Sequence, residues 1–179
     1  FSLSSFSLPA RSTLTFTLTC VLVSGASSSS SIDIRTNGAP VPGSFRVSPS
    51  SGQALITSFV FAASSWTDED TPITYEFSYV DGGSRNKMTI QSKSETSFGS
   101  STLPAGLPSN GHKVQCIVLV YDSLAASARA ARNVVVNELA LSTSDLSALI
   151  AQQLASGSGN ADATRQVITT GTSVLNTVN

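Results

Sequence analysis

Hydrophobic and polar residues alternate most regularly along residues 73–79. Every second position of this run is apolar or aromatic: Ile73, Tyr75, Phe77 and Tyr79. Alternation with a period of two, bounded by turn residues, is typical of a half-buried antiparallel strand. The pattern predicts a mainly β chain, a fibronectin III-like or immunoglobulin-like antiparallel sandwich, with the aromatic face of this strand inside.

Strand-like segments lie on both sides of this one. We predict strands at residues 45–47, 55–62, 73–79, 87–91, 97–102, 114–121 and 132–137. Residues 49–52 and Asp81-Gly82-Gly83 are predicted to be turns, because proline, glycine and aspartate favour the backbone angles of tight turns. The proline- and glycine-rich residues 38–43 are predicted to be a linker, so that residues 38–138 form one complete module.

An earlier part of the chain is similar to the end of this module. Residues 12–20 alternate threonine with apolar residues, residues 25–31 resemble a flexible loop, and residues 32–35 resemble a short strand. The run Cys20-Val-Leu-Val matches Cys116-Ile-Val-Leu-Val, which lies about 96 residues later, a spacing typical of one sandwich domain. We therefore predict that residues 1–37 are the C-terminal strands of a preceding β-sandwich.

After Glu138 the apolar positions change to helical spacing. Residues 142–145 supply capping side chains, and an apolar face follows: Leu146, Leu149, Ile150 and Leu154. Residues 157–159 break this helix, and a second apolar stripe follows: Val167, Ile168, Gly171, Val174, Leu175 and Val178. Short amphipathic helices need a neighbour to bury such stripes, so residues 139–179 are predicted to be a helical hairpin packed on a sandwich or another neighbour.

Composition narrows the class of protein. Only 12% of the 179 residues are charged, which is about half the usual share, and the net charge is −1. Because phosphate binding needs clustered basic residues, a nucleic-acid partner is excluded. The longest apolar run, residues 116–121, is far shorter than the roughly 20 residues that cross a bilayer. We expect the chain to be part of a longer polypeptide, with any membrane anchor outside this segment.

One extended motif carries a family resemblance. The chain reads Trp66-x-Asp68-x-Asp70-x-Pro72-Ile73-x-Tyr75-x-Phe77-x-Tyr79, preceded by Val47-x-Pro49-x-x-Gly52-x-Ala54-Leu55. This pattern resembles the receptor-for-egg-jelly (REJ) module of the polycystin family. The resemblance implies fibronectin III-like sandwiches in the extracellular portions of large membrane proteins, among them polycystin-type partners of ciliary cation channels and sperm-surface receptors.

No catalytic arrangement stands out in the sequence. His112 is the single histidine, and no nucleophile motif surrounds any serine, so we expect no enzyme. Our main hypothesis is a structural or adhesion module of a large cell-surface protein, possible sites being a cilium or a flagellum. Its partners would be neighbouring modules, other surface proteins or glycans. Residues 27–31 suit O-linked sugars or a simple flexible loop.

The alternative hypothesis is a receptor module that binds calcium or a glycan through residues 66–70. Asp68 and Asp70 offer oxygen ligands of the kind calcium prefers, although a solvated turn is the simpler interpretation. Asp122 joins them only if the fold brings it close. Trp66 suits a binding aromatic or, more simply, a plug over the end of the sandwich. No other cofactor is expected.

The two cysteines admit several interpretations. An extracellular compartment permits a disulfide between Cys20 and Cys116. However, equivalent positions in successive sandwiches would lie much farther apart than the Cα separation of about 7 Å that a disulfide tolerates. We therefore favour buried free thiols, or partners outside the segment, over a mutual bond.

Overall fold

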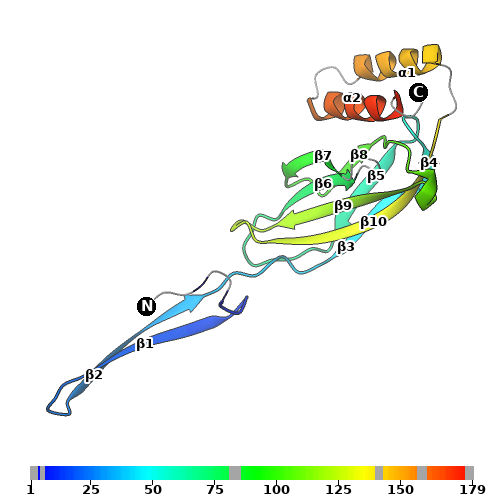
Figure 1. The fold of residues 1–179 in the computed structure, drawn as a ribbon. Coiled ribbons are helices and arrows are strands. Elements are labelled where there is room, and N and C mark those ends of the chain that lie inside the picture. Colours follow the sequence, from blue (N-terminus) through cyan, green and yellow to red (C-terminus); the bar gives the residue numbers. More distant parts are fainter. Residues whose placement is uncertain (1–3, 5–6, 81–85, 140–142, 157–160, 176–179) are drawn as a thin grey trace. The chain divides into compact units, whose positions relative to one another are not determined.

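The computed structural model describes residues 4, 7–80, 86–139, 143–156 and 161–175, which form two compact units. Phe1–Ala39 is unit 1, and Pro40–Asn179 is unit 2. Unit 1 contains one antiparallel hairpin of β1 (Thr13–Val21) and β2 (Ser27–Arg35) (Figure 1). Strands dominate the chain, so the predicted mainly β class is confirmed.

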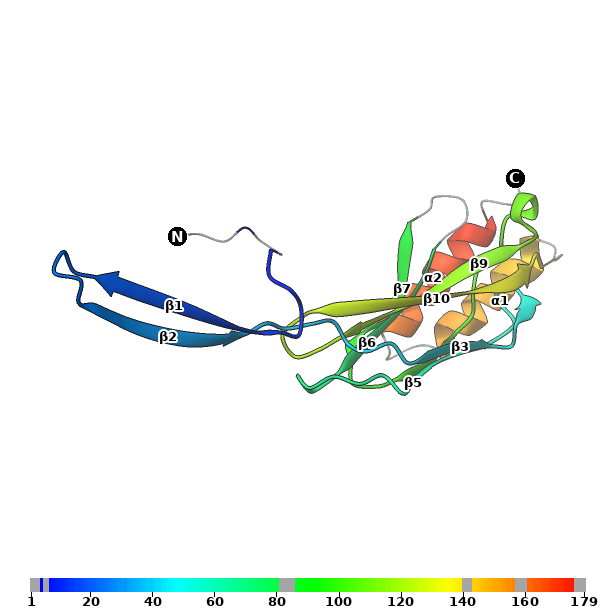
Figure 2. The same ribbon diagram turned by 90° about the horizontal axis from the view of Figure 1, so that it is seen from below.

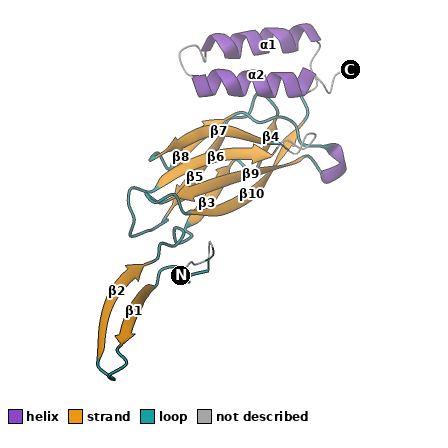
Figure 3. Cartoon of the chain, turned by 60° about the vertical axis from the view of Figure 1, so that its left-hand side comes forward, coloured by secondary structure: helices purple, strands orange, loops and turns teal. Residues whose placement is uncertain are grey.

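Unit 2 is built around two sheets. One sheet has the order β3 (Ser44–Ser48), β5 (Phe59–Ser64) and β8 (Phe98–Ser101). The other has the order β4 (Ser51–Gln53), β10 (Ser127–Asn137), β9 (Lys113–Tyr121), β6 (Thr74–Val80) and β7 (Lys87–Ser94). Neighbouring strands are antiparallel except β4 and β10, which are parallel. A short 3₁₀ helix (Pro108–Asn110) precedes β9 (Figure 3).

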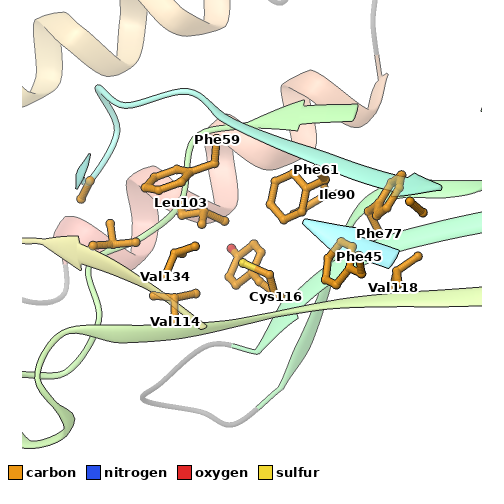
Figure 4. Packing of buried hydrophobic residues seen from close by; sticks show 14 of the residues in the cluster. Phe45, Phe59, Phe61, Phe77, Ile90, Leu103, Val114, Cys116, Val118 and Val134 are labelled. Atoms are coloured by element: carbon orange, nitrogen blue, oxygen red, sulfur yellow. The ribbon is translucent and has the colours of Figure 1, made fainter. Parts of the chain in front are cut away.

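Side chains from both sheets fill one hydrophobic core (Figure 4). The Phe77 ring on β6 lies 6.1 Å from the Phe45 ring and 6.0 Å from the Phe61 ring, between centroids. Phe77 and Tyr79 are buried, and Tyr75 is half-buried against the same core. The alternation along this strand thus places its aromatic face against the opposite sheet, as the sequence predicts.

Several predicted boundaries are wrong in unit 2. Residues 49–52 were expected to form only a turn, but Ser51–Gln53 is β4, whose pairing partner is β10, distant in sequence. The strand expected at residues 55–62 begins only at Phe59, because Leu55 has a φ of 63° that an extended strand does not allow. The last strand begins at Ser127 rather than Arg132. Asp81-Gly82-Gly83 lies outside the described residues.

The flexible loop predicted at residues 25–31 is also wrong. Ser27–Arg35 forms β2, and its serines pair with β1 along the whole strand. Thr17 Oγ1 lies 2.9 Å from Ser31 Oγ, and Thr15 Oγ1 donates to Asp33 at 2.7 Å. Cross-strand pairing between hydroxyl-bearing residues therefore overrides the turn preference of a serine run.

Two helices follow β10, α1 (Thr143–Ser156) and α2 (Ala161–Leu175). Leu149 and Ile150 pack against the sandwich core, and Gln153 Nε2 donates to the Leu55 carbonyl oxygen. A Cβ at Gly171 of α2 would lie 3.1 Å from Ile150 Cδ1, so glycine permits the close approach of the two helices. Figure 2 shows both helices beside the sandwich.

The apolar stripe predicted on the second helix is only partly correct. Val167 is buried, but the Ile168 side chain is 53% exposed and points away from the packed face. Thr170, which the sequence did not place on the stripe, is fully buried. No helix among the described residues has the length and apolar character needed to cross a membrane.

The two cysteines lie in different environments. Both thiols are free. Cys116 is buried in the core of unit 2, and burial raises the pKa of its thiol to about 12. Cys20 is exposed on β1, so the interpretation of a buried thiol is wrong for this residue, whereas a partner outside the segment stays a prediction.

We expect Phe77→Ala to lower the free energy of unfolding by about 3–5 kcal/mol, because Phe77 is fully buried between two other rings. Urea denaturation followed by circular dichroism measures the change. Phe98→Ala is the matched control, since the Phe98 side chain is 65% exposed and its removal should cost less than about 0.5 kcal/mol. Equal losses in the two variants would contradict this description of the core.

We expect a maleimide at pH 8 to modify Cys20 rapidly and to leave Cys116 unmodified in the folded chain. Cys116 is buried, and its raised pKa keeps the thiol protonated at that pH. In denaturant both thiols should react, because unfolding removes the burial that raises the pKa of Cys116. Mass spectrometry counts the modified sites. Modification of Cys116 without denaturant would contradict the core position.

Candidate functional site

Three carboxylates meet at one end of unit 2. Asp68 and Asp70 lie in the connection between β5 and β6, and Asp122 directly follows β9. One oxygen from each carboxylate lies within 4.8 Å of the others. The sequence left open whether the fold brings Asp122 close to Asp68 and Asp70. The structure shows that it does.

Strand pairing explains this meeting. β6 and β9 are antiparallel, with Thr74 opposite Tyr121, so residues before β6 lie beside residues after β9. The Ser123 N–H donates to the Asp70 carbonyl oxygen at 2.9 Å and joins the two connections. The sequence alone could not supply this contact, because it depends on which strands pair.

Local hydrogen bonds fix two of the three side chains. Asp68 Oδ1 accepts a hydrogen bond from the Asp70 N–H at 2.9 Å, and Asp122 Oδ1 accepts one from the Ala126 N–H at 2.8 Å. Such bonds between an aspartate and the backbone a few residues later are typical of tight turns. The Asp122 side chain is buried, whereas Asp68 and Asp70 are half-buried and remain accessible to solvent.

This arrangement can bind a hard cation. Calcium prefers six to eight oxygen ligands, and carboxylates, backbone carbonyls and water all serve. Three aspartates this close repel one another, and a divalent cation between them would offset that repulsion. We call Asp68, Asp70 and Asp122 the acidic cluster. The Asp68 and Asp122 side chains also stabilise the turns whose N–H groups they accept.

Trp66 lies beside the acidic cluster but does not present a binding surface. Its side chain is 5% exposed, and its Nε1–H donates to the Ser44 carbonyl oxygen at 3.4 Å. The next residue, Thr67, forms an isolated bridge with Val41, whose N–H donates to the Thr67 oxygen at 2.8 Å. Trp66 therefore closes this end of the sandwich, and its ring faces are covered by protein.

A polar network that the sequence analysis missed covers the outer face of β6. Glu76 pairs with Lys87 and accepts a hydrogen bond from the Tyr121 hydroxyl at 3.4 Å. Lys93 Nζ lies 4.4 Å from the centroid of the Tyr121 ring. Burial, together with the Glu76 charge, raises the pKa of Tyr121, and burial alone raises that of Tyr75. These are cross-strand contacts that hold the sheet together.

The surroundings of His112 are those of a residue with a structural role. Its Nδ1 lies 3.0 Å from the Gly106 carbonyl oxygen, and this geometry requires the proton on Nδ1. A Cβ at Gly106 would lie 2.2 Å from the backbone carbon of His112, so the close approach depends on glycine. The ring orients the loop before β9, and its hydrogen bond is to the backbone.

Comparison with known protein families gives one match. A family model of the REJ domain matches residues 1–172, which include the hairpin of unit 1, the sandwich and most of α2. No curated protein matches the chain significantly. Because the match extends over nearly all of the sequence, the chain belongs to the REJ domain family, whose modules are typical of the extracellular regions of polycystin-type proteins.

Proposed function

We propose that this chain is a load-bearing structural module of a large cell-surface protein. It would hold neighbouring modules at a defined spacing and serve adhesion rather than catalysis. The observation that carries the proposal is the path of the chain through unit 2. The chain enters the sandwich at one end and leaves it at the other, and an early strand is paired in parallel with the last one.

The entry point lies at the end of β5. Val41 is bonded to Thr67, and Ser44 at the start of β3 is opposite Ser64 at the end of β5. The exit lies at the other end, where the Asn137 carbonyl oxygen accepts a hydrogen bond from the Ala54 N–H at 2.9 Å. A pull between the two ends of the sandwich therefore acts along the strands.

The pairing of β4 with β10 resists such a pull in shear. Val135 is opposite Ser51, and its N–H donates to the Ser50 oxygen at 2.9 Å. The neighbouring bond from Ala54 to Asn137 completes the ladder. Because both strands run in the same direction and the load acts along them, several hydrogen bonds must break together. Peeling an antiparallel hairpin would break them one at a time.

Family and chemistry support the same role. REJ modules are typical of extracellular regions, and the sole histidine is bonded to the backbone. We propose placement at the cell surface, on a cilium or flagellum, with neighbouring modules of the same polypeptide as the first partners. Other surface proteins would bind to the outer faces. Membrane anchorage, where present, would lie outside this segment.

We propose calcium binding at the acidic cluster as a second function. Its support is the meeting of three carboxylates from two connections that are far apart in sequence. A cation there would join the β5–β6 connection to the turn after β9, at the end where the chain enters the sandwich. Glycan binding through Trp66 gains no support, because this side chain is buried.

We expect Val135→Pro to raise the unfolding rate at a fixed pulling force by about tenfold or more. Proline removes the N–H that bonds to Ser50, and a lost sheet hydrogen bond costs about 1–3 kcal/mol. The 179-residue chain is pulled in a single-molecule force experiment through cysteines introduced by Val41→Cys and Glu138→Cys, with Cys20→Ser to remove the exposed thiol.

Val135→Ala is the matched control, because it shortens the same half-exposed side chain and keeps the N–H. Its unfolding rate under force should stay close to that of the unmodified chain. Chemical unfolding without force measures the loss of stability in both variants. If Val135→Pro and Val135→Ala unfolded at the same rate under load, the β4–β10 ladder would not be the mechanical element.

We expect 10 mM calcium to raise the midpoint of thermal unfolding by several degrees relative to EDTA. Extracellular calcium sites have dissociation constants of about 0.1–1 mM, so the stabilisation would be about 1.4–2.7 kcal/mol. Asp70→Asn should abolish the calcium-dependent shift. In EDTA the same variant should melt at a higher temperature, because one of three repelling charges is gone.

Glu138→Gln is the control for the calcium measurement. It removes one exposed carboxylate just after β10, at the opposite end of the sheet from the acidic cluster, and should keep the full shift. Asp68→Asn adds a second test, because asparagine keeps the oxygen that accepts the Asp70 N–H. Unchanged midpoints in calcium, or an equal shift in Asp70→Asn, would rule out the site.

A further inference from the structure

The turn that follows β4 is fastened to both strands of the β4–β10 ladder. On β4, the Thr57 N–H donates to the Gln53 carbonyl oxygen at 3.1 Å, and the Gln53 N–H donates back to Thr57 Oγ1 at 2.8 Å. On β10, the Asn137 carbonyl oxygen accepts a hydrogen bond from the Ala54 N–H at 2.9 Å. A change in the shape of this turn therefore changes the last bonds of the ladder.

Leu55, in the middle of this turn, has a backbone conformation that needs support. Its φ of 63° lies in the left-handed region, which is unfavourable for a residue other than glycine. The residue is fully buried, so both of its backbone polar groups need partners within the protein. Its N–H donates to the Leu103 carbonyl oxygen at 3.3 Å, and its carbonyl oxygen accepts a hydrogen bond from Gln153 Nε2 on α1.

Apolar contacts of α1 and α2, which lie side by side, hold Gln153 in place (Figure 3). Leu149 and Ile150 precede Gln153 by about one helical turn and pack against the sandwich core. Ile150 also lies against Gly171 of α2, and α2 contacts β7. The helices therefore dock as a pair, and the Gln153 amide connects the pair to the Leu55 turn.

One buried group opposes this docking. Thr170 on α2 is fully buried, and its hydroxyl has no hydrogen-bond partner among the described residues. A hydroxyl that leaves water without gaining a partner disfavours the buried state. Helices of this length are also marginal in water without a neighbour. We therefore expect the pair to undock and unwind at a lower load than the sandwich needs to unfold.

We propose that α1 and α2 form a releasable latch on the β4–β10 ladder. While the latch is docked, Gln153 holds the Leu55 turn and the ladder keeps its full resistance. When the latch is released, the Leu55 oxygen loses this hydrogen bond, the turn relaxes, and the ladder breaks at a lower load. The inference rests on the proposed mechanical role of the ladder, and it adds the element that regulates it.

Pulling outside the latch tests the coupling. Cysteines introduced by Val41→Cys and Glu138→Cys, with Cys20→Ser, load the sandwich and leave both helices out of the path of the force. We expect Gln153→Ala to raise the unfolding rate of the sandwich at a fixed force by about tenfold, as for a lost hydrogen bond to a buried carbonyl. The effect passes through the Leu55 turn, because Gln153 itself carries no load.

Gln152→Ala is the matched control, because Gln152 is exposed on the same helix and undergoes the same chemical change. Its unfolding rate should stay within about twofold of that of the unmodified chain. Hydrogen exchange without force gives a second readout. The Ala54 N–H, which donates to Asn137, should exchange about tenfold faster in Gln153→Ala and at an unchanged rate in Gln152→Ala.

Pulling through the latch tests its release. Val41→Cys is combined with Asn179→Cys, so that the force passes through α1 and α2 before it reaches β10. We expect a first step at low force that lengthens the chain by up to about 130–140 Å, because about 40 residues extend by roughly 3.3–3.6 Å each. The sandwich should unfold in a second step. Thr170→Val should slow the first step about threefold or more, since it removes the unpaired hydroxyl.

Two results would overturn the inference. One is the absence of a separate low-force step when the force passes through the latch. The other is an equal unfolding rate of Gln153→Ala and Gln152→Ala when the force bypasses it. The mechanical role of the ladder is judged separately, by Val135→Pro against Val135→Ala in chains with an intact latch. A difference between those two variants, together with equal glutamine variants, would keep the ladder as the mechanical element and remove the latch alone.

Discussion

The antiparallel pairing of β6 with β9 is the constraint on which the rest of unit 2 depends. With Thr74 opposite Tyr121, Phe77 and Tyr79 face the other sheet, and the residues before β6 meet those after β9. A shift by one residue would turn the aromatic side chains to solvent and separate the three aspartates of the acidic cluster. The core and the candidate cation site therefore depend on the same register.

Regular alternation made part of this fold predictable. The run at residues 73–79 shows its buried face directly, because side chains alternate between the two faces of a strand. β4 was missed, since its three residues have no pattern of their own and form a strand only through β10. The serines of β2 were missed for the same reason, because pairing with the threonines of β1 outweighs their preference for loops.

The acidic cluster shows the same limit. Asp68 and Asp70 could be found from their spacing, whereas the contribution of Asp122 depended on strand order, which the sequence does not state. The polar network around Glu76 was hidden in the same way, because its partners lie on β7 and β9. Candidate residues that lie close together in the sequence could be predicted, whereas contacts between strands could not.

The linker between the units is secured on each side by its own unit. In unit 1 the Arg11 guanidinium donates to the Ala39 oxygen, and Thr36 Oγ1 donates to the Pro9 oxygen at 2.5 Å. In unit 2 the Val41 N–H is bonded to Thr67. The stretch of backbone between these bonds is short, and the ring of Pro40 fixes the φ angle of that residue. A long glycine-rich linker would absorb extension before the folded units carried any load. The short connection therefore suits the proposed role of unit 2 as one module of an array in which force passes from each module to the next.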